Sequence, residues 1–408
     1  MEADSGSGDH ITQLCSTILD LPPSCIEFSP VAPEYFIVGT YNLQKEENMV
    51  PGEEEGNEDS DDPAVQVGKK QQSRDGSLIL CKIVDGNLTL VQTLSYPSAI
   101  LDLHFSPQDP HTFAIVSSTG RFSTFTLQTN DEVNVSVQHL STTQLFPDDV
   151  IITSFVFHPS DPALVAVTLS TGAVHLFRTS TISAGTYPEV TPSEPVITHT
   201  LEAWCCNFST TPGTTLYSGG DDARLRSVTF ADLAQAGITE ESIEIASPAA
   251  GFRGHEAGVT AILPLPVPRA RSSDEVSTLL TGSYDDHVRV ISISQNRARV
   301  LSELYIGGGV WRLKQIFVPS KESKADRAVF TILASCMHAG ARILEVREEG
   351  EGEWKIEILG KVELHKSMNY GSDVQPHVGD IGCGRDQEVL CVSTSFYDKL
   401  LCVWKFLP

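Results

Sequence analysis

Short apolar runs rich in Val, Ile, Leu, Phe and Thr recur along the whole chain, and turn residues separate them. Most runs come in pairs, in which an apolar run ending in small residues is followed by a tight turn and a run of alternating apolar and polar residues. This pattern predicts β-strands rather than helices. Seven such pairs are present, at residues 36–40 with 77–83, 112–127, 164–178, 215–230, 278–293, 331–346 and 389–406.

The pairs repeat at a spacing typical of propeller blades. Each pair has a turn residue that lies six positions before a bulky residue of its second strand. In chain order these turn residues are Asp75, Thr119, Thr171, Asp222, Asp285, His338 and Asp398. Four-stranded blades repeat at roughly 40–45 residues, and the somewhat longer intervals here indicate lengthened loops. A third apolar run precedes most pairs and a fourth follows several. We therefore predict an all-β fold: one seven-bladed β-propeller domain that spans residues 1–408.

The two ends of the chain predict how the ring closes. The last blade stops at Pro408 without an outer strand, whereas residues 10–20 form an apolar run before the first inner strand. We expect residues 10–20 to pair with the last blade, because an open ring would leave an exposed strand edge. Between Glu46 and Asp62 there are acids and no bases, mixed with Gly, Pro and Ser. This composition predicts a disordered acidic insertion within blade 1, at residues 44–75.

Composition narrows the functional classes. The net charge of −25 argues against nucleic-acid binding, which requires clustered Lys and Arg. No apolar run is long enough to cross a bilayer, and the polar, acidic N-terminus is unlike a secretory signal, so we expect a cytoplasmic protein. The nine cysteines include no C-x-x-C pair, which favours reduced thiols over zinc sites. We expect no metal and no cofactor.

Several motifs resemble a known family. The segments 217–222, 254–255 and 281–285 are similar to WD repeats, and Trp404 keeps the tryptophan that names them. Further segments, taken in order with these, resemble the WD-repeat diphthine methylesterases of diphthamide biosynthesis, also called diphthine methyltransferases. These segments are 39–41, 98–102, 202–204, 308–312, 336–340 and 395–398.

The resemblance implies a WD40-type propeller that acts as a hydrolase. Its family removes a methyl group, as a protein modification, from the methylated diphthine on elongation factor 2. The reaction is hydrolysis of a carboxylic ester, and the partner is elongation factor 2 in the cytoplasm. The alternative is a non-catalytic WD-repeat scaffold for protein–protein interaction, because the fold alone does not define a function. A reader of peptides or methyl-lysine is a third possibility.

The sequence offers one candidate base and no nucleophile. His255, Ser283 and Asp285 invite a catalytic-triad interpretation, but WD blades commonly use such residues in a structural hydrogen-bond network, which we favour. No G-x-S-x-G elbow is present. His338 stands where other repeats have Asp, so the blade network does not explain it. We take His338 as the candidate general base, ahead of His287 and His365.

Aromatic residues predict a cation site. Trp204 and Trp311 each begin an inner strand, which places them at the mouth of the central channel. Together with Tyr41 and other residues beside blade turns they suit a trimethylammonium group, although plain packing is an equally good explanation. The candidate substrate-binding residues are Trp204, Trp311, Tyr284, Tyr397, Asp221 and Asp286. Convergence of Trp204, Trp311, His338 and Tyr397 would favour the enzyme or the reader over the scaffold.

Overall fold

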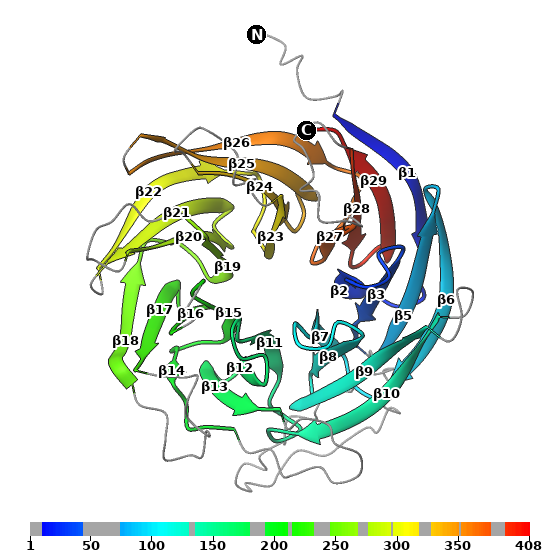
Figure 1. The fold of residues 1–408 in the computed structure, drawn as a ribbon, viewed down its shortest axis with the longest axis horizontal. Coiled ribbons are helices and arrows are strands. Elements are labelled where there is room, and N and C mark those ends of the chain that lie inside the picture. Colours follow the sequence, from blue (N-terminus) through cyan, green and yellow to red (C-terminus); the bar gives the residue numbers. More distant parts are fainter. Residues whose placement is uncertain are drawn as a thin grey trace, which may run out of the picture.

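The structure is a computed structural model that describes residues 10–43, 74–129, 135–179, 192–210, 214–231, 245–267, 276–294, 297–317, 328–350, 352–376 and 388–408. Every regular element in these ranges is a β-strand, and the strands form seven sheets. The sheets stand around one axis as the blades of a propeller (Figure 1). The predicted seven-bladed, all-β fold is confirmed.

The first three blades follow one another along the chain. Blade 1 contains β2 (Pro23–Phe28), β3 (Tyr35–Thr40), β5 (Arg74–Val84) and β6 (Asn87–Tyr96), and the short β4 (Asn42–Leu43) pairs with the start of β5. Blade 2 contains β7 (Ile100–Phe105), β8 (Thr112–Ser117), β9 (Arg121–Thr129) and β10 (Val135–Gln144). Blade 3 contains β11 (Ile152–Phe157), β12 (Leu164–Leu169), β13 (Ala173–Arg178) and β14 (Ile197–Thr198).

The remaining blades keep the same order from the inner to the outer strand. Blade 4 contains β15 (Ala203–Phe208), β16 (Thr215–Gly220), β17 (Arg224–Phe230) and β18 (Ile245–Arg253). Blade 5 contains β19 (Val259–Leu265), β20 (Val276–Ser283), β21 (His287–Ser294) and β22 (Arg297–Tyr305). Blade 6 contains β23 (Arg312–Phe317), β24 (Val329–Ser335), β25 (Ala341–Gly350) and β26 (Glu353–Val362).

Blade 7 combines the two ends of the chain. Its strands are β27 (Ser372–Val374), β28 (Val389–Ser395), β29 (Leu400–Phe406) and β1 (Ile11–Ile18). Strand β1 runs antiparallel to β29, from the pair Ile11↔Phe406 to the pair Ile18↔Leu400. The predicted closing strand is therefore confirmed. The acidic insertion expected at residues 44–75 lies, up to residue 73, outside the described residues.

The hydrophobic core lies between neighbouring blades. One cluster joins Ile37 and Leu80 of blade 1 to Phe113 and Phe125 of blade 2, and others join blades 6 and 7 in the same way. The second strands are the most deeply buried, since all six residues of β3 and of β12 are buried. Each blade is thus stabilised by its neighbours, as the repeat pattern requires.

A β-bulge recurs at one place on the inner strands. In blades 1 to 5 the ladder between the first and second strands skips one residue near the start of the inner strand. The skipped residues are Ser24, Leu101, Thr153, Trp204 and Thr260. Ser24 donates a hydrogen bond to the Ile100 carbonyl at 2.6 Å, and Thr153 to the Ala203 carbonyl at 2.5 Å, each in the next blade. These bulges lock adjacent blades together and re-aim one side chain per blade.

The described part of the chain contains no disulfide and no helix that could span a membrane. The eight cysteines there are free thiols, and all but Cys15 are buried. Within the same ranges, we find no helix with the length and hydropathy needed to cross a bilayer.

Candidate functional site

The turns after the second strands and the loops before the inner strands open on one face, which we call the rim face. Within each blade the turn and the loop are joined by backbone hydrogen bonds. Asp221 N bonds the Glu202 carbonyl at 2.8 Å in blade 4, and Tyr284 N bonds the Gly258 carbonyl at 2.9 Å in blade 5. Phe396 N bonds the Met368 carbonyl at 2.9 Å in blade 7. Residues far apart in the sequence therefore meet around one mouth.

Two tryptophans form the centre of an aromatic cluster on this face. Trp204 is the bulged residue of blade 4, between the pairs Ala203↔Gly220 and Cys205↔Gly219. Trp311 directly precedes β23, and its backbone N–H bonds the Ser335 carbonyl at 2.8 Å. The ring centroids of the two tryptophans are 5.5 Å apart. Trp204 and Trp311, two of the four residues whose convergence would favour the enzyme or the reader, therefore lie together.

Further rings extend the cluster from Trp311 toward blades 7 and 1. Ring centroids of Tyr284 and Tyr370 lie 6.0 and 5.0 Å from that of Trp311. Phe396 follows at 5.3 Å from Tyr370, and it contacts Tyr397 at 5.1 Å. Tyr41 lies 6.0 Å from Phe396. We call this continuous set the aromatic rim: Tyr41, Trp204, Tyr284, Trp311, Tyr370, Phe396 and Tyr397. Sequence reasoning missed Tyr370 and Phe396.

Carboxylates border the tryptophan end of the rim. Trp204 Nε1 donates a hydrogen bond to Asp221 Oδ1 at 3.2 Å, and Asp221 is exposed. A Cβ at Gly258 would lie 2.5 Å from Asp221 Oδ1 and 2.9 Å from Tyr284 Cδ2, so both side chains pack over this glycine. Burial, helped by Tyr370, Asp221 and Glu202, raises the pKa of Tyr284 well above its usual value. The Tyr284 phenol therefore stays neutral.

His338 lies on the rim face but outside the ring contacts. Its turn borders the rim through Met337, because a Cβ at Gly309 would meet Met337 Sδ at 2.8 Å and Tyr284 Cδ1 at 3.4 Å. The His338 side chain is exposed, and no ring contact or hydrogen bond joins it to another described side chain. Asp286 is half-buried in the turn of blade 5 with φ +62°, and its carbonyl accepts a hydrogen bond from Ile306 N at 2.9 Å.

The residues of the triad interpretation belong to the blade network instead. His255 Nε2 bonds Thr281 Oγ1 at 2.9 Å, while the Ser283 hydroxyl donates to the Ala257 carbonyl at 3.0 Å. Asp285 binds the Arg289 guanidinium at 2.8 and 2.9 Å. Burial lowers the pKa of His255 to about 4, so the ring is neutral. The structural interpretation is the one the geometry supports.

The other two candidate histidines are also engaged. His365 Nε2 bonds Ser393 Oγ at 2.9 Å, and Trp404 Nε1 donates to the same oxygen at 3.0 Å. Burial lowers the pKa of His365 to about 4. His287 Nδ1 lies 2.6 Å from the Asp285 carbonyl, and its ring contacts Tyr305 at 5.4 Å. Of the candidate bases, His338 alone is uncommitted within the described residues.

Charged side chains of four inner strands meet in the channel below the rim. Arg312 Nη2 and Asp102 Oδ1 form an ion pair at 2.7 Å between blades 6 and 2. His104 lies 2.8 Å from Glu27 and 3.4 Å from Asp102. Lys314 forms an ion pair with Asp373. We call this set the ionic cluster: Glu27, Asp102, His104, Arg312, Lys314 and Asp373. Charged residues on otherwise apolar inner strands are the sequence feature that could have revealed it.

Asp102 and His104 are held in their charged forms within the cluster, whereas burial raises the pKa of the Asp373 carboxyl despite its ion pair with Lys314. Burial alone would favour neutral groups, but Arg312 and His104 hold the pKa of Asp102 well below its usual range. Against the same burial, Asp102 and Glu27 raise the pKa of His104 to about 10. The His104 imidazole is therefore a cation at neutral pH and is not a general base.

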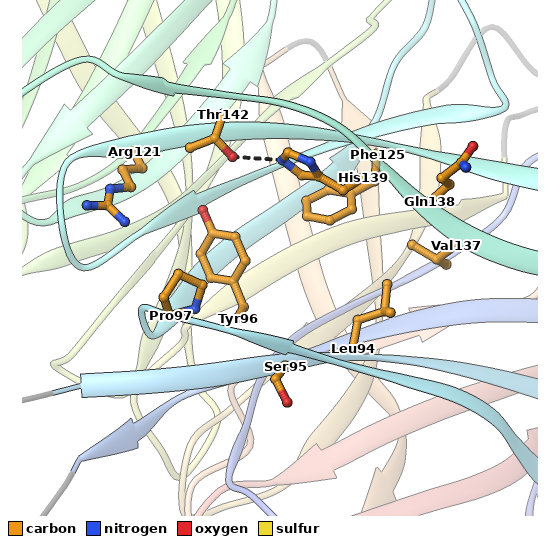
Figure 2. Close-up of a pocket in the computed structure, with 10 residues that line it drawn as sticks. All are labelled: Leu94, Ser95, Tyr96, Pro97, Arg121, Phe125, Val137, Gln138, His139 and Thr142. Carbon is orange, nitrogen blue, oxygen red and sulfur yellow. Dashed lines mark hydrogen bonds between the residues drawn. The ribbon is translucent and has the colours of Figure 1, made fainter.

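A separate pocket of about 520 Å³ lies between the outer strands of blades 1 and 2 (Figure 2). In it His139 Nε2 bonds Thr142 Oγ1 at 2.8 Å, and Thr142 Oγ1 also lies 2.7 Å from Ser123 Oγ. Tyr96 closes the chain of hydroxyls at 2.7 Å from Ser123. No residue of the aromatic rim lines this pocket. It offers a histidine beside a hydroxyl, and its two other aromatic side chains, Tyr96 and Phe125, are buried in the blade core.

Metal binding has no support in the described part of the chain. There, no group of three or more His, Cys, Asp or Glu side chains is placed to hold an ion.

The fold and its rim define a seven-bladed propeller of the WD-repeat type. The chain is similar in structure to Sqt1 of Chaetomium thermophilum bound to the N-terminus of the ribosomal protein L10. The TM-score is 0.57 at 13% identity, over 95% of this chain and 97% of that one. A second structure of Sqt1 gives a TM-score of 0.56 over 93% and 83% of the two chains. At this identity the likeness shows the fold alone.

In sequence, the chain is similar to proteins named diphthine methyltransferase. It is 26% identical over 387 residues to that of Schizosaccharomyces pombe, which covers 95% of both chains. It is 25% identical over 429 residues to that of Saccharomyces cerevisiae, over 94% of this chain and 95% of that one. The human protein is 26% identical over 349 residues, over 82% and 68% of the two chains. No family model matches the chain. The resemblance predicted from the motifs is confirmed.

Proposed function

We propose that the protein hydrolyses the methyl ester of methylated diphthine on elongation factor 2. The names of the relatives support a role in diphthamide biosynthesis and an enzyme that acts on a methyl group of diphthine. The finer assignment, a carboxylic ester hydrolase with a cytoplasmic protein substrate, is our proposal. The single observation that carries it is the aromatic rim with Asp221 at its edge.

The rim suits the quaternary ammonium of diphthine. A trimethylammonium group has no N–H and cannot be recognised by hydrogen bonds to nitrogen. Aromatic faces and nearby carboxylates are therefore what can bind it, and each ring contact contributes roughly 0.5–2 kcal/mol. These rings are half-buried, and each of Trp204, Tyr284 and Tyr370 contacts Trp311. Asp221 accepts a hydrogen bond from Trp204. The net charge of −25 further attracts a cation to this protein.

The proposed chemistry needs one base and one water molecule. The water oxygen attacks the ester carbonyl, the acyl–oxygen bond breaks, methanol leaves, and a carboxylate remains on the substrate. We assign His338 as the group that takes the proton of the water, because it is exposed, unpaired within the described residues and on the rim face. Tyr397, which is 69% exposed, and Asp286 would contact the surrounding protein substrate.

The test is direct incubation of the purified full chain with elongation factor 2 that carries methylated diphthine, in heavy-oxygen water. Hydrolysis predicts loss of the methyl group, release of methanol, and one heavy oxygen atom in the new carboxylate by mass spectrometry. A methyl group that moves to an acceptor without release of methanol would indicate a transferase. Tight binding of elongation factor 2 without loss of the methyl group would support the alternative function, a non-catalytic scaffold.

A further inference from the structure

Arg312 links the aromatic rim to the channel. It directly follows Trp311 in the sequence, and Trp311 makes ring contacts with Trp204, Tyr284 and Tyr370. Arg312 pairs with Ser335 at the first position of β23, whereas Lys314 pairs with Leu333 two positions further along. The guanidinium of Arg312 is therefore the charged group of its strand nearest to the rim. Its side chain keeps 27% of its surface exposed.

In the Asp102–Arg312 ion pair, the carboxylate accepts from several donors, whereas the guanidinium uses only one of its nitrogens. Asp102 is buried, and its two oxygens receive Arg312 Nη2 at 2.7 Å, His104 Nε2 at 3.4 Å, Leu103 N at 3.0 Å and Phe155 N at 3.2 Å. The carboxylate is thus saturated with donors. Arg312 gives it one nitrogen, and a weak bond at 3.5 Å joins the same Nη2 to the Leu101 carbonyl.

The guanidinium has donors left over. Its Nε is buried without a partner, and its Nη1 makes no hydrogen bond to any described residue. Glu27 and Asp102 both interact with the charge of Arg312, so what the guanidinium offers a ligand is its unused hydrogen-bond donors. An arginine held in place by one carboxylate, with part of its side chain exposed and donors unused, is suited to a second planar anion.

We propose that Arg312 is the carboxyl-binding residue of the rim, so that rim and guanidinium together recognise a betaine, a quaternary ammonium with a carboxyl group one carbon away. This inference rests on the proposed function. The rings hold the trimethylammonium group, and Nη1 binds the carbonyl oxygen of the ester before hydrolysis and the carboxylate after it. Asp102 is a positioning residue, because it fixes the guanidinium from the channel side.

The substrate class follows from this pairing. An ester with no adjacent cation would lose the ring contacts, and a quaternary ammonium with no carboxyl group would lose the contact to Arg312. The small molecule that combines both groups is trimethylglycine, which matches the reacting end of diphthine. The free product carboxylate should bind more strongly than the ester, since a charge-assisted hydrogen bond is stronger than a neutral one.

Calorimetric titration of the full chain tests the inference without turnover. The ligands are tetramethylammonium, trimethylglycine and trimethylglycine methyl ester. The wild type should bind trimethylglycine at least about tenfold more tightly than tetramethylammonium, from one charge-assisted hydrogen bond. Arg312→Gln should remove that preference and leave the affinity for tetramethylammonium within about threefold, because the rings remain. Equal binding of trimethylglycine and tetramethylammonium by the wild type would overturn the inference.

Lys314→Met is the matched control. It removes one positive charge from the same strand and the same ionic cluster, but one layer further from the rim. The preference for trimethylglycine should survive in this variant, and its loss would show a general effect of charge instead of contact with Arg312. If Arg312→Gln does not fold, Arg312→Lys keeps the charge but not the planar fork and should weaken the preference. Betaine preference without hydrolysis of methylated elongation factor 2 would reject the proposed function and leave this site standing.

Discussion

The rings of Trp204 and Trp311 lie 5.5 Å apart although they belong to blades 4 and 6. Blade 5 stands between them and places Thr260 at its bulge, the position that Trp204 occupies in blade 4. The Thr260 side chain turns away and bonds the Val310 carbonyl. A small residue in the middle blade therefore lets two large rings meet above it, and the aromatic rim is continuous for this reason.

Trp311→Ala should weaken substrate binding, because Trp311 contacts three rings, among them Trp204, which is hydrogen-bonded to Asp221. Loss of one or two cation–π contacts predicts an increase of roughly tenfold in KM for methylated elongation factor 2, with a smaller change in kcat. Trp311→Phe should restore part of the affinity. Tyr305→Ala is the control, since Tyr305 is 60% exposed and lies outside the aromatic rim. Equal effects of the two alanine variants would contradict a cation site at the rim.

His338→Asn should lower kcat by at least about 100-fold if this histidine accepts the proton of the attacking water. The comparison is His139→Ala, which removes a second exposed histidine, the one beside Thr142 in the other pocket (Figure 2). Single-turnover rates of ester hydrolysis would separate the two variants. A large loss in His139→Ala together with normal rates in His338→Asn would move the reaction to the pocket between blades 1 and 2.

The blades could be predicted because each strand pair is encoded by a pattern of neighbouring residues. Alternating apolar residues between turn residues define each strand pair, and the repeat spacing defines their number. The closing strand could be predicted by counting strands per blade. The last blade lacked an outer strand, and residues 10–20 belonged to no other blade. Trp204 and Trp311 were predictable as rim residues for a related reason: both stand at the start of an inner strand, and all inner strands start at the same mouth.

The rest of the site depends on relations between blades. Asp102 and Arg312 face each other only because blades 2 and 6 share a channel, and nothing in either strand specifies its partner. Tyr370 was missed because it lies in the loop before the short β27, where no strand pattern marks it. The repeat spacing predicted that His338 lies in a turn. It did not predict that Met337 adopts φ +40° and forms a β-bridge with Asn369 of blade 7. The histidine is thereby left exposed, unlike the aspartates that hold other blade turns.

His104→Gln should make the stability of the fold nearly independent of pH on the alkaline side. In the folded protein the pKa of His104 is raised to about 10 from 6.5. A raised pKa means that protonation stabilises the fold, fully below about pH 6.5, and that this contribution is lost as the pH rises through 10. For Asp102 the pKa is lowered, so its contribution is present above the usual pKa of 3.8 and is lost on acidification.

Urea midpoints measured from neutral pH to pH 10 check this expectation. The wild type should lose stability steadily across that range, whereas His104→Gln should be less stable at neutral pH but nearly flat on the alkaline side. His139→Ala, at an exposed histidine outside the ionic cluster, should follow the wild-type slope. Parallel slopes for wild type and His104→Gln would show that His104 is not held as a cation.

Removal of residues 1–19 should destabilise the ring, because β1 is the outer strand of blade 7. Without it the edge of β29 from Leu400 to Phe406 is unpaired, and Ile11, Leu14 and Cys15 no longer pack on the core. Loss of these partly buried side chains predicts a Tm lower by roughly 5 °C or more, together with self-association through the free edge. Removal of residues 1–9 is the control, because it ends before β1 begins. A synthetic peptide of residues 10–20, added in trans, should raise the Tm of the longer truncation and reduce its association in light scattering. If the longer truncation melts like the full chain and stays monomeric, pairing of β1 with β29 does not hold the ring closed.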